Sequence, residues 1–185
     1  MGMDIVDIVE MVEVVGIAMR VLGLILAVVI CALPTWIETT FIATNFTNTG
    51  VVLYGLWMSC VTQGMGETQC GVYNSIGWYL PDVLQAARAM ILTAIILGVL
   101  GVVVSMVGAK CANCVKDETS QDKLINFAEI QLILAGIIIL TPVFLVAISI
   151  IDHSTQIERE TVLGASLYFG WMAAALLLIG GSYEG

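Results

Sequence analysis

Four long apolar segments alternate along the chain with stretches in which polar residues collect. The segments run from Val14 to Leu33, from Ala86 to Ala109, from Ile125 to Ile150 and from Val162 to Ile179. A helix rises about 1.5 Å per residue and the hydrocarbon core of a bilayer is about 30 Å thick, so each segment can span a membrane. The pattern predicts a mainly α membrane protein, with four transmembrane helices in one domain that covers residues 1–185.

The long connection at residues 34–85 has the pattern of a small β-sheet. Ile37–Ile42 and Val51–Ser59 are rich in β-branched and aromatic residues, and turn-prone residues lie between them. A second turn is expected at Gly64–Gly66. We therefore expect an antiparallel sheet that sits on the helix bundle.

Composition and charge support the membrane setting and give an orientation. Hydrophobic residues make up 59% of the chain, charged residues make up 11%, and the mean hydropathy is +1.02. Soluble domains carry about 25% charged residues. Three lysines lie in the connection at residues 110–124: Lys110, Lys116 and Lys123. The positive-inside rule places this connection and both termini in the cytoplasm, and residues 34–85 and 151–161 outside the cell.

The first residues of the chain are acidic. Aspartate or glutamate occupies positions 4, 7, 10 and 13, where a secretory signal would carry positive charge. We therefore expect the first span to remain in the mature protein.

Two cysteines of the outer connection suit a disulfide. Cys60 and Cys70 are separated by nine residues and lie in an oxidising compartment in this topology. Closing such a loop contributes about 2.5 to 3 kcal/mol in the chain-entropy account. The alternative is that both thiols are free. Asn45 begins an Asn-Phe-Thr glycosylation sequon in the same connection, which agrees with its outward placement.

The remaining cysteines have different surroundings. Cys111 and Cys114 follow the second span at the expected inner membrane surface, where reversible palmitoylation is expected. A zinc site would need two further ligands, which this short connection lacks. Cys31 lies in the first span and is expected to fill space in the core.

Two ionisable residues fall inside predicted spans, where a charge costs at least about 2.5 kcal/mol. Arg20 and Glu129 lie at similar depth, because both spans run outward from the cytoplasm. We expect them to pair across a helix interface; the alternative is that each side chain reaches the membrane surface separately. Arg88, at the outer end of the second span, is expected to tie the bundle to the outer connection. Pro142 is expected to bend the third span.

Catalysis is not expected. The single histidine, His153, has no serine or cysteine near it in a spacing typical of a nucleophile and its base. No motif for phosphate, metal or cofactor binding is present, and the acidic chain offers no basic face for nucleic acid.

Several motifs together resemble the claudin family of tight-junction proteins. They are Trp36, the triplet Gly55-Leu56-Trp57, the two cysteines at positions 60 and 70, the Leu84–Ala89 segment that contains Arg88, the Gly108–Cys114 segment, and the Gly164–Trp171 segment. The motifs touch the outer connection and all four spans, when Cys31–Pro34 is included. The resemblance implies a left-handed four-helix bundle under an extracellular sheet. It also implies assembly into strands at cell-cell contacts, with partners that are copies of itself or other claudins.

Two regions depart from that family. Residues 152–161 read DHSTQIERET and lack the aromatic-asparagine-proline turn that claudins commonly use in contacts across the gap between cells. The end of the chain lacks the cytoplasmic extension and terminal Tyr-Val typical of members that bind PDZ scaffolds, so no PDZ scaffold is expected as a partner.

The resemblance also suggests which residues would line a paracellular path. Glu38, Glu67 and Asp82 are the only charges between Trp36 and Gln85, and fixed negative charge beside a water-filled path favours cations. The position after the second cysteine often carries the selectivity charge in claudins; here it is Gly71, which leaves a barrier role open. Tyr73 would lie near the path by the same resemblance. The alternative is that the carboxylates are only part of a solvated face.

Two other functions remain as alternatives at this point. Peripheral-myelin-type proteins and auxiliary channel subunits share the motif of tryptophans and paired cysteines, and they modulate a partner membrane protein. A redesigned or truncated claudin that presents its loops to a toxin or an antibody is the other alternative.

Overall fold

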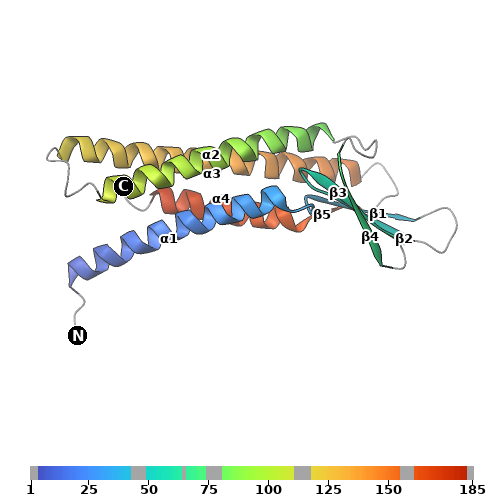
Figure 1. Ribbon diagram of the computed structural model, residues 1–185, viewed down its shortest axis with the longest axis horizontal. Coiled ribbons are helices and arrows are strands. Elements are labelled where there is room, and N and C mark those ends of the chain that lie inside the picture. The colour runs from blue at the N-terminus through green and yellow to red at the C-terminus, as the bar shows by residue number, and fades with distance from the viewer. Residues whose placement is uncertain are drawn as a thin grey trace.

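Four helices form the body of the protein and a sheet caps one end of it (Figure 1). The computed structural model describes residues 4–42, 49–63, 66–73, 81–110, 118–154 and 161–182. The helices are α1 (Ile5–Ala32), α2 (Asp82–Lys110), α3 (Glu118–Ser154) and α4 (Ala165–Ser182). All four are long and apolar enough to cross a membrane, which confirms the predicted fold class.

The helices differ from the predicted spans mainly at their ends. α1 begins nine residues before Val14, and α3 extends beyond its predicted span at both ends. The fourth span was expected from Val162, but Thr161–Leu163 forms a short strand, β5, and α4 begins only at Ala165. Hydropathy alone does not separate these two elements, because the strand is as apolar as the start of a span.

Small residues allow the helices to approach closely. α4 packs against both α1 and α3, and α2 packs against α3. An added Cβ at Gly170 of α4 would lie 2.7 Å from the Val143 side chain of α3, and one at Gly98 of α2 would lie 2.5 Å from the Leu24 side chain of α1. Such contacts are typical of helix pairs in membranes, where backbone proximity replaces hydrophobic association. Pro142 lies inside α3, which continues past it.

The sheet has five antiparallel strands in the order β4-β3-β2-β1-β5. Four of them come from the long connection at residues 34–85: β1 (Ile37–Ile42), β2 (Thr49–Tyr54), β3 (Met58–Gln63) and β4 (Glu67–Val72). β5 joins the edge beside β1, directly before α4. The small antiparallel sheet was therefore predicted correctly.

One predicted strand is in fact two. Residues Val51–Ser59 were expected as one strand-forming segment, whereas the chain turns at residues 55–57 and returns as β3 beside β2. The next turn ends at Gly66, which has a φ of 84° and donates its N–H to the Gln63 carbonyl at 2.9 Å. Glycine adopts this left-handed conformation without steric cost.

The sheet lies beyond the ends where α1 finishes and α4 begins. α1 begins and α4 ends at the opposite end of the bundle (Figure 1). The sheet therefore caps one end of the bundle, and the first residues of α1 and the last of α4 lie at the other.

Candidate functional site

Trp36 joins the first helix to the sheet. Its side chain is fully buried, and its indole N–H donates to the Ile30 carbonyl at 2.8 Å. The last carbonyls of a helix have no partner within the helix, so this bond satisfies one of them at the end of α1. The backbone N–H of Trp36 also donates to the Tyr54 carbonyl at 2.8 Å, which places β1 beside β2.

The Gly55-Leu56-Trp57 turn packs directly against the chain that leaves α1. A Cβ at Gly55 would lie 2.3 Å from the Cα atom of Pro34, so no larger residue fits there without moving backbone. The Gly55 N–H donates to the Met58 carbonyl at 3.0 Å and closes the turn. Leu56 is fully buried in the core, which anchors the turn on the helices.

Arg88 of α2 holds the same turn from the other side. Its Nε donates to the Leu56 carbonyl at 2.9 Å, and its Nη2 donates to the same oxygen. The guanidinium carbon lies 4.5 Å from the centre of the Trp57 ring, a distance typical of cation–π contact. The expected tie between bundle and outer connection therefore runs through a carbonyl and an aromatic face.

Tyr73 completes this attachment. Its hydroxyl donates to the Gly55 carbonyl at 2.9 Å, and its ring is only 6% exposed. Burial, and then the neighbouring Tyr54, raise the pKa of Tyr73 from 10.0 to about 12, although Arg88 and the Gly55 hydrogen bond act in the opposite direction. Tyr73 was expected beside a path; in a single copy it lies under the turn and not on the open surface of the sheet.

The expected disulfide is present. Cys60 of β3 and Cys70 of β4 lie directly opposite each other in the register and are bonded. Among the described strands, β4 is an edge strand and pairs only with β3, so the disulfide adds a covalent link to the backbone hydrogen bonds that hold it. Cys31 is a buried free thiol, as expected for a residue that fills space in the core.

The two carboxylates of the sheet lie on opposite faces. The register places Glu38 in one row with Leu53, Cys60 and Cys70, so these four side chains share a face. Successive side chains along a strand alternate between faces, so Glu67, three residues before Cys70, points to the other face. A path along one face of the sheet would therefore meet one carboxylate of each copy, not both.

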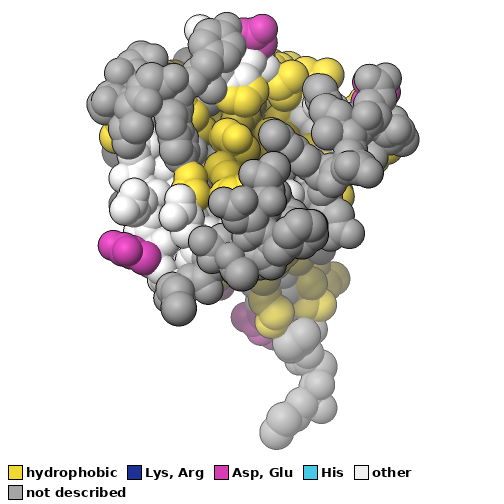
Figure 2. Space-filling view, turned by 90° about the vertical axis from the view of Figure 1, so that its right-hand side faces the viewer, with side chains coloured by type: hydrophobic (Ala, Val, Ile, Leu, Met, Phe, Trp, Pro, Cys, Tyr) yellow, Lys and Arg dark blue, Asp and Glu magenta, His cyan; other side chains and the backbone are white. Residues whose placement is uncertain are grey.

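Gly71 shares a face with Glu67 but lies closer to the helices. It pairs with Ser59, whose side chain is fully buried. Within the described residues, the five strands carry two carboxylates and no lysine, arginine or histidine. Figure 2 shows this end of the molecule, with acidic side chains at the rim, hydrophobic ones near the centre, and no basic side chain among the coloured atoms.

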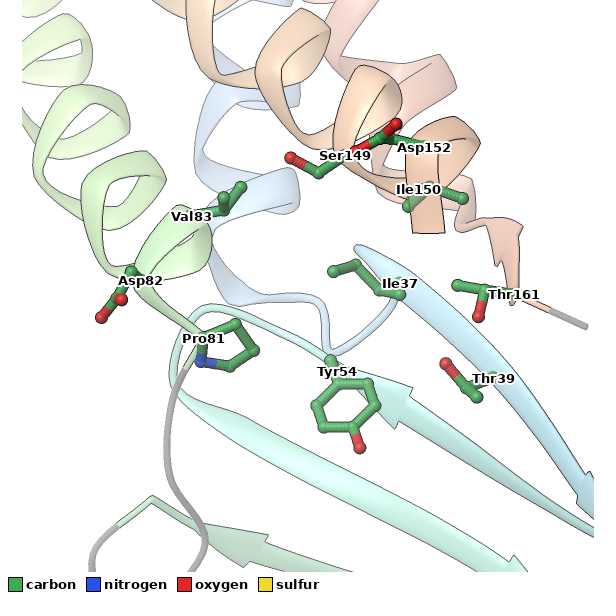
Figure 3. Close-up of a pocket in the computed structure, with 10 residues that line it drawn as sticks. All are labelled: Ile37, Thr39, Tyr54, Pro81, Asp82, Val83, Ser149, Ile150, Asp152 and Thr161. Atoms are coloured by element: carbon green, nitrogen blue, oxygen red, sulfur yellow. The ribbon is translucent and has the colours of Figure 1, made fainter. Parts of the chain in front are cut away.

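A cavity of about 540 Å³ lies between the sheet, the start of α2 and the end of α3 (Figure 3). Ile37, Val83 and Ile150 contribute apolar side chains to its lining, and the Asp82 carboxylate points away from its centre. In the part of the chain that the structure describes, no three His, Cys, Asp or Glu side chains are grouped as metal ligands would be.

Arg20 forms a buried polar cluster inside the bundle, far from the sheet. It is 1% exposed, donates from Nε to the Gly180 carbonyl of α4 at 2.8 Å, and donates from Nη1 to the Ser105 hydroxyl of α2. The neighbouring Gly181 lies against Glu129 of α3, because a Cβ there would be 3.5 Å from the Glu129 carbonyl oxygen. Gly180 and Gly181, adjacent in α4, thus contact Arg20 and Glu129 respectively. The ion pair between Arg20 and Glu129 stays a prediction.

Sequence reasoning did not identify Ser105 and Gly180 as partners of Arg20, or Tyr73 as a support for the turn. A serine or glycine in an apolar helix is too common in membrane proteins to single out. Three predictions lie outside the described residues: glycosylation at Asn45 and palmitoylation at Cys111 and Cys114.

Comparison with known proteins gives consistent matches. The model of the PMP-22/EMP/MP20/Claudin family matches residues 10–183. Claudin-4 of Bos taurus is 45% identical over 174 residues, which cover 92% of this chain and 83% of that protein. Claudin-3 of Homo sapiens is 44% identical over 174 residues, which cover 92% of this chain and 79% of that protein.

Proposed function

The chain belongs to the PMP-22/EMP/MP20/Claudin family, and we propose that it acts as a claudin-like tight-junction protein with a weakly cation-selective paracellular path. In this proposal copies assemble side by side in the plasma membrane, with the sheet outside the cell and both termini in the cytoplasm. The sheets then bound the space between cells. If the assembled sheets leave no open path, the same assembly acts as a barrier with little conductance.

The charge of the sheet carries the proposal. Its five strands present carboxylates at Glu38 and Glu67 and no basic side chain among the described residues. Fixed charge of one sign in a confined aqueous path concentrates ions of the opposite sign. The connection at residues 110–124 carries the lysines instead, which supports the outward placement of the sheet.

The selectivity should be weak, because each face offers one carboxylate. A unit charge about 7 Å from a permeating ion in water contributes about 0.6 kcal/mol. Physiological salt, with a Debye length of about 8 Å, reduces this energy by roughly half. Attraction of cations and repulsion of anions together then give a permeability ratio of about two.

The test is electrical. Epithelial cells that lack their own claudins would express the chain, and conductance and sodium-chloride dilution potentials would be measured across the layer. We expect the parent chain to give a cation-to-anion permeability ratio above one. The ratio should fall towards one in Glu67→Gln if the face with Glu67 lines the path, and in Glu38→Gln if the other face does.

Glu10→Gln is the matched control, since it removes the same charge at the opposite end of the bundle, where Glu10 is exposed. An equal cation preference in all three variants would refute the role of the sheet charges. Surface expression without any change in conductance or barrier would refute the junctional function itself.

A further inference from the structure

The buried stripe of α1 continues beyond the region where other helices cover it. Ile5, Ile8, Val9 and Val12 occupy positions i, i+3, i+4 and i+7, which share one face of a helix. The same face continues at Gly16, the first buried residue of α1, and then along the helix interface. We call these four apolar residues the N-terminal stripe.

No described helix packs over the N-terminal stripe. α4 runs antiparallel to α1 and reaches Gly16, because a Cβ at Gly180 would lie 3.4 Å from the Gly16 carbonyl oxygen. α4 then ends at Ser182. Ile5 is 81% exposed and Val9 is 53% exposed. Figure 1 shows α1 diverging from the other helices toward its first residue.

The hydrocarbon core of the membrane does not cover the N-terminal stripe. α1 has 28 residues and is about 42 Å long, whereas the hydrocarbon core is about 30 Å thick. The far end of α1 is fixed at the sheet through Trp36, so the excess length falls at the start of the helix. A tilt of about 45° would be needed to bury all of it, beyond the usual range for membrane helices.

Acidic residues surround the N-terminal stripe. Asp4 and Glu13 border it on its two sides, and Asp7 and Glu10 lie on the opposite side of the helix. No lysine or arginine precedes Arg20. A second copy of this segment would bring carboxylates against carboxylates, and the anionic lipids of an inner membrane surface would repel it. Charge complementarity therefore calls for a basic occupant.

We propose that the N-terminal stripe is a docking site for a basic amphipathic helix of a partner protein, on the side of the bundle opposite the sheet. The apolar face of the partner helix would cover Ile5, Ile8, Val9 and Val12, and its lysine or arginine heads would meet Asp4 and Glu13. The partner helix would pack along α1, with apolar contacts at helical spacing on both helices. The site does not depend on the sheet or on ion permeation, and its first residues lie before the range that the family model matches.

The probe is a synthetic helical peptide of leucine and lysine, with leucines at i, i+3, i+4 and i+7. The full chain would be placed in nanodiscs of neutral phosphatidylcholine, and binding would be followed by fluorescence anisotropy. We expect the double variant Ile5→Ser/Val9→Ser to weaken binding about tenfold or more, since two exposed apolar contacts are lost. Asp4→Asn/Glu13→Gln should also weaken binding and should reduce its dependence on salt.

Two control peptides separate docking from general attraction of charges. One has the same composition with the leucines distributed around the helix, and the other has glutamate in place of lysine. Equal binding of either control peptide, or unchanged binding by the serine variant, would overturn the proposal. Efficient Val9→Cys cross-linking between copies would assign the stripe to self-association and would also overturn it. The substituted residues lie outside the core, so the thermal stability of each variant should match that of the parent.

Discussion

Arg20 should be coupled to Glu129 through a buried ion pair inside the bundle. The test is a double-mutant cycle with Arg20→Leu, Glu129→Leu and the double variant. Arg20 is fully buried and donates to the Gly180 carbonyl and the Ser105 hydroxyl. Its loss would remove both bonds and, if the pair exists, would leave the Glu129 carboxylate without its cation.

The magnitudes follow from these contacts. Each hydrogen bond between membrane helices contributes about 0.6 kcal/mol on average, so the bonds of Arg20 to Gly180 and Ser105 account for about 1 kcal/mol. Removal of one partner of a buried ion pair costs about 3 to 5 kcal/mol, whereas replacement of both by apolar residues is often nearly neutral. We therefore expect Arg20→Leu to cost about 4 kcal/mol and the coupling energy with Glu129→Leu to exceed about 2 kcal/mol.

The assay is reversible unfolding in mixed micelles, titrated with a denaturing detergent and followed by tryptophan fluorescence. Ser105→Ala is the control, because it removes one acceptor of Arg20 without touching a charge; its effect should be about 1 kcal/mol or less. Single effects of Arg20→Leu and Glu129→Leu that add within about 0.5 kcal/mol would refute the pair. Arg20 would then be held in the bundle by its bonds to Gly180 and Ser105 without a contribution from Glu129.

Four further predictions concern the fold and the sheet. Gly55→Ala should destabilise the protein by about 3 kcal/mol in the same unfolding assay, since its methyl group would meet backbone, and a wild-type midpoint would contradict this. Reduction of Cys60–Cys70 should lower stability by about 2.5 to 3 kcal/mol relative to the oxidised protein; no shift in the midpoint would argue against this value. The folded pKa of Tyr73 exceeds the unfolded value, so stability should fall as the pH rises from 10 to about 12, and Tyr73→Phe should remove that part of the loss in a pH series of melts. Pro142→Ala should straighten α3 in a determined structure of the variant, because the proline lacks the N–H that would continue the helix ladder; an unchanged axis would count against a bend at this residue.

The sequence predicted the membrane helices and the disulfide because both depend on local or strongly patterned signals. A run of about twenty apolar residues is enough to indicate a span. Cys60 and Cys70, with nine residues between them in a connection that was expected to lie outside the cell, are enough to suggest a bond. The boundary before α4 needed tertiary information, because Thr161–Leu163 is apolar and merges with the span that follows. Gly164 separates them: a Cβ there would lie 2.1 Å from the Thr35 carbonyl oxygen, so the chain passes against the segment between α1 and β1 before the helix can begin.

In the candidate site too, some roles could be expected from the sequence and others required the structure. Residue type and position were sufficient to expect that Arg88 ties the bundle to the sheet, because an arginine at the end of a span needs a polar partner. The division of Glu38 and Glu67 between two faces follows only from the strand register, which depends on where the chain turns. Once Gly55 is seen to turn the chain, the register fixes every face, since a shift of one residue would reverse them all.

The attachment of the sheet also bears on how weak charges can select ions. The single carboxylate available on each face contributes an energy close to thermal energy, so its effect depends on a constant distance to the path. Trp36 and Arg88 link the sheet region to α1 and α2 through hydrogen bonds to backbone carbonyls, and Tyr73 supports the turn between them in the same way. These bonds do not depend on a second side chain keeping one rotamer. A rigid sheet with few charges and a mobile sheet with many could give similar selectivity. The contacts of this chain favour the rigid arrangement, in which the position of a carboxylate matters more than the number of carboxylates.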